Sequence, residues 1–327
     1  MKIFLSILLL AHLPVYYGQQ TNTVLSGSIS LHKSVERNAG IIYFSSDNGT
    51  TWEDRSNGLP NDIFLSDIAV ADGLLGISTK QSGIFLFDFQ KNSWMNTLNK
   101  PQTSANLDVL FFHNNTLFVG TQNEGIFISR DKGKTWAAYN TGLGNLTIRR
   151  FAAIDHRLYA GTNAGLYVLD EQKNIWLLAY TAPLLQVNGI TEFEGEIYIG
   201  TNQGAFKTSK ESKEWKHVLL NRSLHNISVA DKTIYASVYN ELFASTDKGK
   251  TWTSDQKGMP FDRYTFQVIQ TGPSILAAQW DGIYRKEKII NWMPTNQGLP
   301  AKFPAYRMKN YKNMVVVASS GWVKKKG

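Results

Sequence analysis

The stretch GIFISRDKGKTW at residues 125–136 decides the fold. Its first half alternates side chains as a strand does, Asp131 and Gly133 supply a tight turn, and Trp136 opens a returning strand, so the segment predicts a β-hairpin. Six further segments end in the same way, and their tryptophans are Trp52, Trp94, Trp176, Trp215, Trp252 and Trp292. A hairpin that returns at nearly constant spacing indicates a repeat architecture.

A second pair of short strands precedes most of these hairpins. Examples are residues 109–121, 152–162 and 190–201, each with two apolar runs around a short polar turn. Four antiparallel strands in a unit of about 40 residues are typical of a β-propeller blade. The recurring Trp is expected to fill the space between neighbouring blades.

The two ends of the chain complement each other. The hairpin that ends at Trp52 lacks clear inner strands, whereas Tyr306 to Ser319 supply inner strands after the last hairpin. Joining both ends in one blade would close the ring and remove open sheet edges. The sequence therefore predicts an all-β fold, a seven-bladed β-propeller of four-stranded antiparallel blades. Additional strand-like segments at residues 24–31 and 321–323 leave an eight-bladed ring as an alternative.

Composition narrows the function classes. The chain has 327 residues, no Cys, 34 Lys+Arg and 26 Asp+Glu, for a formal net charge of +8. Without Cys there are no disulfides, thiolate nucleophiles or thiolate zinc sites. The lysines are spread over hairpin tips and not gathered with aromatic residues, so nucleic acid is not an expected partner. We expect a monomer.

The first residues predict export. Lys2 precedes an apolar run within residues 1–18, as in a cleaved signal peptide, and no later stretch is long enough for a membrane span. The expected organisation is a signal peptide at 1–18 and a single propeller domain at 19–327 with a basic tail at 324–326. A secreted or periplasmic location in a bacterial envelope fits an exported chain without Cys.

Three hairpins keep the full pattern S-x-D-x-G-x-T-W. The residues expected to shape them are Asp47, Gly49, Trp52, Asp131, Gly133, Trp136, Asp247, Gly249 and Trp252. The pattern resembles the Asp-box, or bacterial neuraminidase repeat, of secreted β-propellers such as sialidases, sortilin-type receptors and photosystem assembly factors. Its chemistry is local, because Asp accepts backbone N–H groups, Gly takes a positive φ and Trp packs. The other four units lose this Asp but keep the Trp, so we interpret the box as structural.

The loops that lead from one blade to the next are expected to surround the central channel and to carry the function. Four of them share a G-[LM]-[PG] turn, and the position eight residues after its Gly holds Ser66, Arg150, Phe266 or Tyr306. The predicted ligand-binding rim consists of Ser66, Arg149, Arg150, His225, Arg263, Tyr264, Phe266, Tyr306 and Arg307. Asp62 and Asp262 lie on the same loops.

The rim favours binding over catalysis. A glycosidase needs two carboxylates at a defined separation. The loop candidates are Asp62, Asp67 and Asp262, and Asp62 and Asp262 lie on loops two apart in the ring. The F/Y-R-I-P segment of sialidases is absent from the sequence. We expect an exported, non-catalytic binding or scaffolding module for a protein or glycan, without metal or cofactor. The alternative is a glycoside hydrolase, sialidase-like or otherwise exo-acting, that uses the same face.

Overall fold

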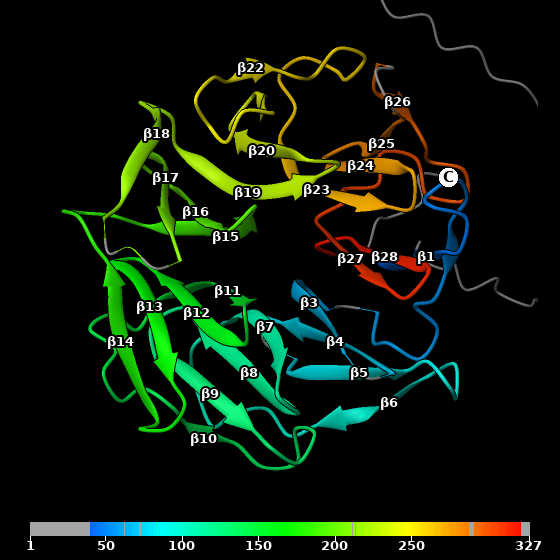
Figure 1. Cartoon of the computed structure of the whole chain (residues 1–327). Helices are drawn as coiled ribbons and strands as arrows, with labels where there is room; N and C mark the ends of the chain where they lie inside the picture. The colour runs from blue at the N-terminus through cyan, green and yellow to red at the C-terminus, as the bar shows by residue number, and fades with distance from the viewer. Residues whose placement is uncertain are drawn as a thin grey trace, which may run out of the picture. The chain divides into compact units, whose positions relative to one another are not determined.

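The computed structural model describes residues 40–61, 63–71, 73–80, 82–210, 212, 214–287 and 291–321. These residues form 28 strands, no helix, and seven four-stranded antiparallel sheets arranged in a ring (Figure 1). The predicted seven-bladed propeller is confirmed, and the eight-bladed alternative is wrong for the described chain. The predicted signal peptide, residues 24–31, Asp62, the third strand proposed at 321–323 beyond Gly321, and the basic tail lie outside the described residues.

The first three blades follow one another along the chain from Leu65 to Tyr180. Blade 1 consists of β3 (Leu65–Ala71), β4 (Leu74–Thr79), β5 (Ile84–Asp88) and β6 (Ser93–Leu98). Blade 2 consists of β7 (Leu107–His113), β8 (Thr116–Thr121), β9 (Ile126–Ser129) and β10 (Ala137–Ala138). Blade 3 consists of β11 (Ile148–Ile154), β12 (Arg157–Thr162), β13 (Gly165–Asp170) and β14 (Ile175–Tyr180).

Four further blades complete the ring. Blade 4 consists of β15 (Val187–Phe193), β16 (Glu196–Thr201), β17 (Gly204–Ser209) and β18 (Lys216–Leu220). Blade 5 consists of β19 (Leu224–Ala230), β20 (Thr233–Val238), β21 (Leu242–Ser245) and β22 (Thr253–Ser254). Blade 6 consists of β23 (Thr265–Thr271), β24 (Ser274–Gln279), β25 (Gly282–Lys286) and β26 (Met293–Pro294). Blade 7 consists of β27 (Arg307–Tyr311), β28 (Met314–Ala318), β1 (Ile42–Ser45) and β2 (Glu53–Asp54).

Blade 7 closes the ring by joining the two ends of the described chain. β1 pairs antiparallel with β28, with Ile42 opposite Ala318 and Ser45 opposite Val315. Successive inner strands pack against each other around the centre, and β27 packs against β3. The predicted closure of the ring is therefore confirmed.

Six of the seven recurring tryptophans form a hydrogen bond to the blade before their own. In blade 3 the Trp176 indole N–H donates to the Tyr139 carbonyl of blade 2 at 2.9 Å. The same bond to a backbone carbonyl of the preceding blade is formed by Trp52, Trp94, Trp136, Trp252 and Trp292. The indoles thus combine apolar packing with a satisfied polar edge, as buried Trp requires.

Three of the four G-[LM]-[PG] turns cover the Trp of the next blade. The turn at Gly58 approaches Trp94 less closely, since a Cβ there would lie 3.5 Å from the Trp94 Cβ, and Trp94 stays partly exposed. Gly142 has φ +87°, and a Cβ there would lie 2.2 Å from the Trp176 carbonyl oxygen. The Trp176 N–H in turn donates to the Thr141 carbonyl at 2.8 Å. The turns at Gly258 and Gly298 approach Trp292 and Trp52 just as closely. These three covered tryptophans are buried, whereas Trp136, Trp215 and Trp252, which follow loops without the turn, stay partly exposed.

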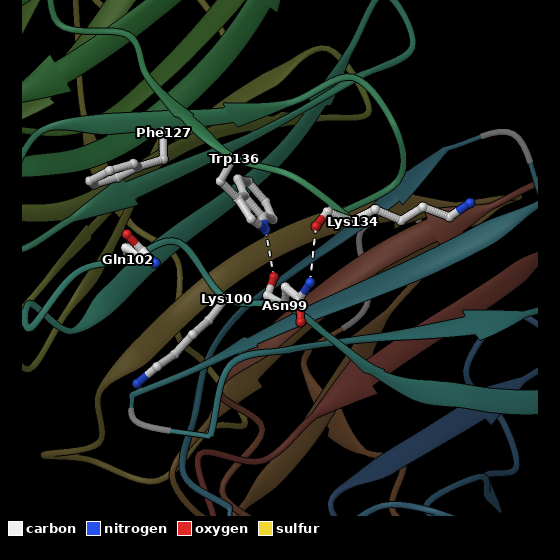
Figure 2. A pocket seen from close by; sticks show the side chains of 6 residues that line it. All are labelled: Asn99, Lys100, Gln102, Phe127, Lys134 and Trp136. Carbon is white, nitrogen blue, oxygen red and sulfur yellow. Dashed lines mark hydrogen bonds between the residues drawn. The ribbon is translucent and has the colours of Figure 1, made fainter.

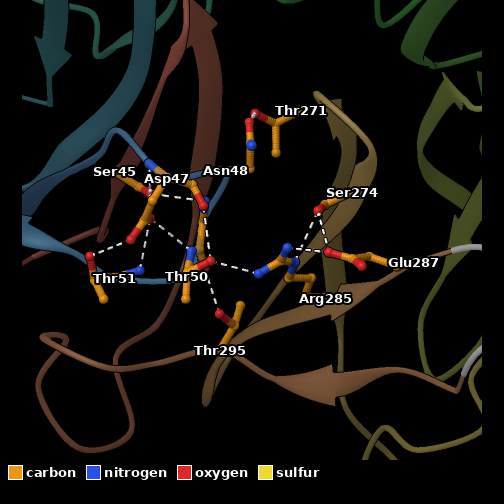
Figure 3. Close-up of polar contacts among 11 residues, drawn as sticks. Ser45, Asp47, Asn48, Thr50, Thr51, Thr271, Ser274, Arg285, Glu287 and Thr295 are labelled. Carbon is orange, nitrogen blue, oxygen red and sulfur yellow. Dashed lines mark hydrogen bonds and ion pairs between the residues drawn. The ribbon is translucent and has the colours of Figure 1, made fainter.

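Each S-x-D-x-G-x-T-W hairpin is closed by its own side chains (Figure 3). Asp47 accepts the Thr51 N–H at 2.9 Å and the Thr51 hydroxyl at 2.6 Å, and the Ser45 hydroxyl bonds both Asp47 and the Gly49 N–H. Burial raises the Asp47 pKa, but the Thr51 and Ser45 bonds prevail and lower it to about 2. Across the blade junction, Arg285 donates to the Thr50 hydroxyl at 2.6 Å.

Two hairpins without the boxed Asp use an Asp one residue earlier. Asp88 accepts the Gln90 N–H at 2.9 Å, and Asp170 accepts the Lys173 N–H at 3.1 Å. Turn capping by a carboxylate therefore persists in blades 1 and 3, although the motif is not visible in their sequences.

Candidate binding site at the mouth of the central channel

Six of the seven inner strands begin with a β-bulge at the mouth of the channel, the exception being β27. In β7, Leu107 lies opposite Thr121 and Val109 opposite Gly120, so Asp108 has no partner in the ladder. The same shift in register occurs in β3, β11, β15, β19 and β23. The bulged residues, here called the bulge ring, are Ser66, Asp108, Arg149, Asn188, His225 and Phe266. Bulges re-aim side chains and are frequent beside functional sites.

The register corrects one prediction from the sequence. Arg149, and not Arg150, occupies the bulge position equivalent to Ser66. The reason is that the loop between Gly142 and β11 is one residue shorter than the loop between Gly58 and β3. Arg150 is the residue that follows the bulge, where blade 1 has Asp67.

A cavity of about 190 Å³ opens at the channel mouth. Its lining consists of Arg149, Arg150, Asn188, His225, Tyr264, Phe266, Tyr306 and Arg307. Seven of these residues belong to the predicted rim, and the eighth is Asn188, which the loop analysis missed but which shares the bulge position. We call this cavity the cationic cup. Of the other predicted rim residues, Ser66 lines an adjoining cavity, and Arg263 is exposed beside Asp262 and lines neither.

Arg307 is the arginine of the cup that forms an ion pair, and its partner is Asp67. Its Nε donates to Asp67 Oδ1 at 2.9 Å, and the second Asp67 oxygen accepts the Leu110 N–H at 3.2 Å. The guanidinium carbon lies 3.9 Å from the centre of the Tyr306 ring, and one of its N–H groups donates to the Tyr306 hydroxyl at 3.1 Å. Burial acts to lower the Arg307 pKa, but Tyr306 and Asp67 raise it overall.

Arg149 and Arg150 are held by neutral groups. Arg149 donates to the side chain of Asn188 and, at 3.0 Å, to Asn163 Oδ1. Arg150 donates from Nε to the Asn188 carbonyl at 3.2 Å. Within the described residues neither forms an ion pair with a carboxylate. Burial lowers the pKa of both, and repulsion from Arg307 lowers that of Arg150 further. Since guanidinium stays protonated, the cup carries excess positive charge. Asp108 attracts Arg149 and Asp67 attracts Arg150, but neither carboxylate forms an ion pair with them.

Aromatic rings form the other wall of the cup. The Tyr264 ring centre lies 4.3 Å from that of His225 and 4.6 Å from that of Phe266, which is in turn 5.2 Å from Tyr306. Burial, with a contribution from Arg149, lowers the pKa of His225, and its Nε2 is buried without a partner. Burial raises the pKa of Tyr264 to about 12. At neutral pH this wall is therefore uncharged, and it combines apolar ring faces with the tyrosine hydroxyls and the neutral imidazole.

A larger cavity of about 520 Å³ adjoins the cup. It shares Arg149, Phe266, Tyr306 and Arg307 with the cup and adds Ser66, Lys80, Asp108 and Trp280. Burial raises the pKa of Asp108, although Lys80 and Arg149 act against it. Ser66 Oγ is buried and has no hydrogen-bond partner. The mouth thus offers a cationic cup beside a wider basin with hydroxyl, carboxyl and aromatic groups.

Hydrogen bonds between neighbouring inner strands make the mouth rigid. Asn188 Nδ2 donates to the Leu224 carbonyl at 2.7 Å, and Asn226 Nδ2 donates to the Phe266 carbonyl at 3.2 Å. The Met308 N–H donates to the Gln267 side chain at 3.2 Å. A site built on cross-linked strands keeps its geometry without a ligand.

The described residues contain no group of three His, Asp or Glu side chains placed to hold a metal ion. They also contain no helix long and apolar enough to cross a bilayer. Neither observation adds a function to the site.

Comparisons with known proteins support the architecture. No family model matches the chain, and no curated protein matches it. Among solved structures, the extracellular domain of the one component system BT4673 from B. thetaiotaomicron superposes with a TM-score of 0.68 at 14% identity over 88% of this chain. This chain spans only 40% of the length of that structure.

In two further solved structures the match covers most of both chains. YCF48 bound to D1 peptide gives a TM-score of 0.60 at 12% identity, covering 80% of this chain and 93% of that one. BamB from Moraxella catarrhalis gives 0.53 at 14% identity, covering 80% and 84%. At such identities the likeness shows the propeller fold alone.

Proposed function

We propose that this protein is an exported propeller of the Asp-box type that binds an anionic group of a protein or glycan ligand in the cationic cup, without chemistry. The observation that carries the proposal is the pair Arg149 and Arg150, adjacent and half-buried at the channel mouth, with no ion-paired carboxylate among the described residues. Charged groups withdrawn from water are stabilised by a counter-charge, and guanidinium groups bind carboxylates in a bidentate manner.

The aromatic wall adds to this recognition. Tyr264, Phe266 and Tyr306 offer faces on which a sugar ring or an apolar side chain can pack beside the anionic group. A binding role agrees with the neighbours, which include extracellular domains and YCF48 bound to a peptide. Export rests on the signal-like residues 1–18, and the absence of Cys favours a bacterial envelope as the location of the exported chain.

Hydrolysis of a glycoside is a second candidate. Asp108 favours it, because a carboxyl with a raised pKa can act as a general acid and this one lines the basin next to Tyr306. Asp67 is less suited as its partner, since both of its oxygens are engaged by Arg307 and Leu110. Release of sugar from a bound glycan distinguishes this candidate from pure binding.

The test is a screen of glycan and peptide arrays with the whole protein, Arg150→Gln and Lys250→Ala. Gln at 150 keeps a donor for the Asn188 carbonyl but removes the charge, and Lys250 is exposed on a hairpin tip outside the cup. We expect the wild type and Lys250→Ala to bind ligands with a carboxylate or sulfate, and Arg150→Gln to lose the subset of them that occupies the cup. The proposal is contradicted if Arg150→Gln loses none of these ligands, and sugar release would favour the hydrolase.

A further inference from the structure

A second site lies at the outer junction of blades 1 and 2. At the junction of blades 2 and 3 the turn at Gly142 covers Trp176, which is 1% exposed. Blade 1 has no such turn after β6 and enters blade 2 through residues 99–102. Trp136 therefore remains partly exposed. β6 and β10 are the outermost strands of blades 1 and 2, and β9 lies beside β10, so this opening is separate from the channel mouth (Figure 1).

The uncovered indole forms one wall of a groove of about 570 Å³ (Figure 2). The groove is lined by Asn99, Lys100, Gln102, Phe127, Lys134 and Trp136. Its volume falls within the range of about 300–1,000 Å³ that is usual for small-molecule sites. It shares no lining residue with the cationic cup or with the adjoining basin.

Hydrogen bonds fix the groove before any ligand arrives. The Trp136 indole N–H donates to the Asn99 carbonyl, and Asn99 Nδ2 donates to the Lys134 carbonyl at 3.1 Å (Figure 2). Asn99 thus ties the loop of blade 1 to the hairpin of blade 2 through two hydrogen bonds. A preorganised wall lowers the entropic cost of binding.

The lining defines the chemistry of the ligand. Trp136 and Phe127 are partly exposed and provide aromatic faces, Gln102 provides an amide, and Lys100 and Lys134 provide two exposed ammonium groups. None of the described lining residues is acidic. Aromatic faces stack on the C–H faces of sugar rings, amides bond hydroxyls, and ammonium groups pair with anions.

We propose that this groove binds an acidic sugar unit of a polysaccharide, carboxylated or sulfated, independently of the channel mouth. The side chains of Lys100 and Lys134 extend in different directions (Figure 2), so each lysine is placed to pair with an anionic group on a different unit of the polysaccharide, and the indole selects the ring. An acidic peptide satisfies the lysines but does not use the flat aromatic face in the same way. The surface would hold the protein on an anionic polysaccharide while the cup remains free for its own ligand.

The test is calorimetric titration of the whole protein with four probes: a galacturonate tetramer, a sulfated tetrasaccharide, an uncharged galactose tetramer and a hexaglutamate peptide. The variant Lys100→Ala/Lys134→Ala removes the charges at exposed positions and leaves the packing intact. Lys250→Ala is the matched control, because Lys250 holds the same place in its hairpin as Lys134. Arg150→Gln tests for binding at the cup.

We expect at least one acidic tetramer to bind the wild type, Lys250→Ala and Arg150→Gln within twofold of each other. The double variant is expected to bind it at least tenfold more weakly, and the carboxylated and sulfated probes identify which anion is preferred. Several results would overturn the proposal: no binding of either acidic tetramer, equal binding of the uncharged tetramer, tighter binding of hexaglutamate, or unchanged affinity of the double variant. Loss of acidic-tetramer binding in Arg150→Gln alone would assign it to the cup.

Discussion

Replacing Trp176 by alanine removes a side chain that is 1% exposed and whose indole N–H donates to the Tyr139 carbonyl at 2.9 Å. A buried Trp removes roughly 150–250 Å² from water, which at about 25 cal/mol per Å² corresponds to about 4–6 kcal/mol. Truncations of buried aromatic residues cost about 3–5 kcal/mol, since the site partly relaxes. We therefore expect Trp176→Ala to lower the free energy of unfolding by about 3–5 kcal/mol.

Trp136→Ala is the matched comparison. The same hairpin position and the same type of carbonyl bond are lost, but the Trp136 ring lacks a covering turn and is partly exposed. We expect a loss of about 1–3 kcal/mol, because less area returns to water. Urea unfolding followed by circular dichroism measures both values. An equal decrease in the free energy of unfolding for both variants would refute the argument that the glycine turn over Trp176, and not the Trp alone, excludes water from the junction of blades 2 and 3.

Three further predictions concern ionisable groups. The Thr135 bonds lower the pKa of Asp131 to about 2, below its unfolded value of 3.8, so it contributes stability above pH about 4 that is lost as the pH falls towards 2. Urea midpoints of Asp131→Asn should therefore depend less on pH in that range, and an unchanged pH profile would contradict this. Asp67→Asn leaves the Arg307 charge without its partner and should lower the free energy of unfolding by about 3 kcal/mol; a loss below about 1 kcal/mol in urea unfolding would argue against the pair. The pKa of His225 is held below 6.5, so the free energy of unfolding should decrease as the pH falls below about 6.5, where the unfolded imidazole takes up a proton and the folded one does not. An NMR titration midpoint above 6.5 would contradict the burial of His225 in the cup.

The repeat and the closure of the ring could be predicted because they leave local signals. Alternation, turn residues and a Trp at constant spacing appear in each hairpin, and the inner strands near the C-terminus complement the hairpin at Trp52. The carboxylates Asp88 and Asp170 were missed because a turn can be capped from the preceding position without altering the hairpin.

The site was less accessible from sequence because it depends on backbone register and on contacts across the ring. A bulge shifts Arg149 to the place expected for Arg150, and a one-residue difference in loop length carries no hydrophobic signal. Asn188 was missed for the same reason. Arg307 is paired with Asp67, whereas Arg149 has no carboxylate partner among the described residues. This difference depends on contacts between blades, so the sequence alone does not reveal it.

The most direct test of the central claim is a double-mutant cycle between the cup and its ligand. Affinity of the best ligand from the array screen is measured by calorimetry in its anionic form and in a form whose carboxylate or sulfate has been neutralised, against wild type and Arg150→Gln. If the cup binds the anion, neutralising the ligand weakens binding to the wild type by about tenfold or more and has little further effect on Arg150→Gln. Equal weakening of both proteins would place the anion elsewhere and contradict the account.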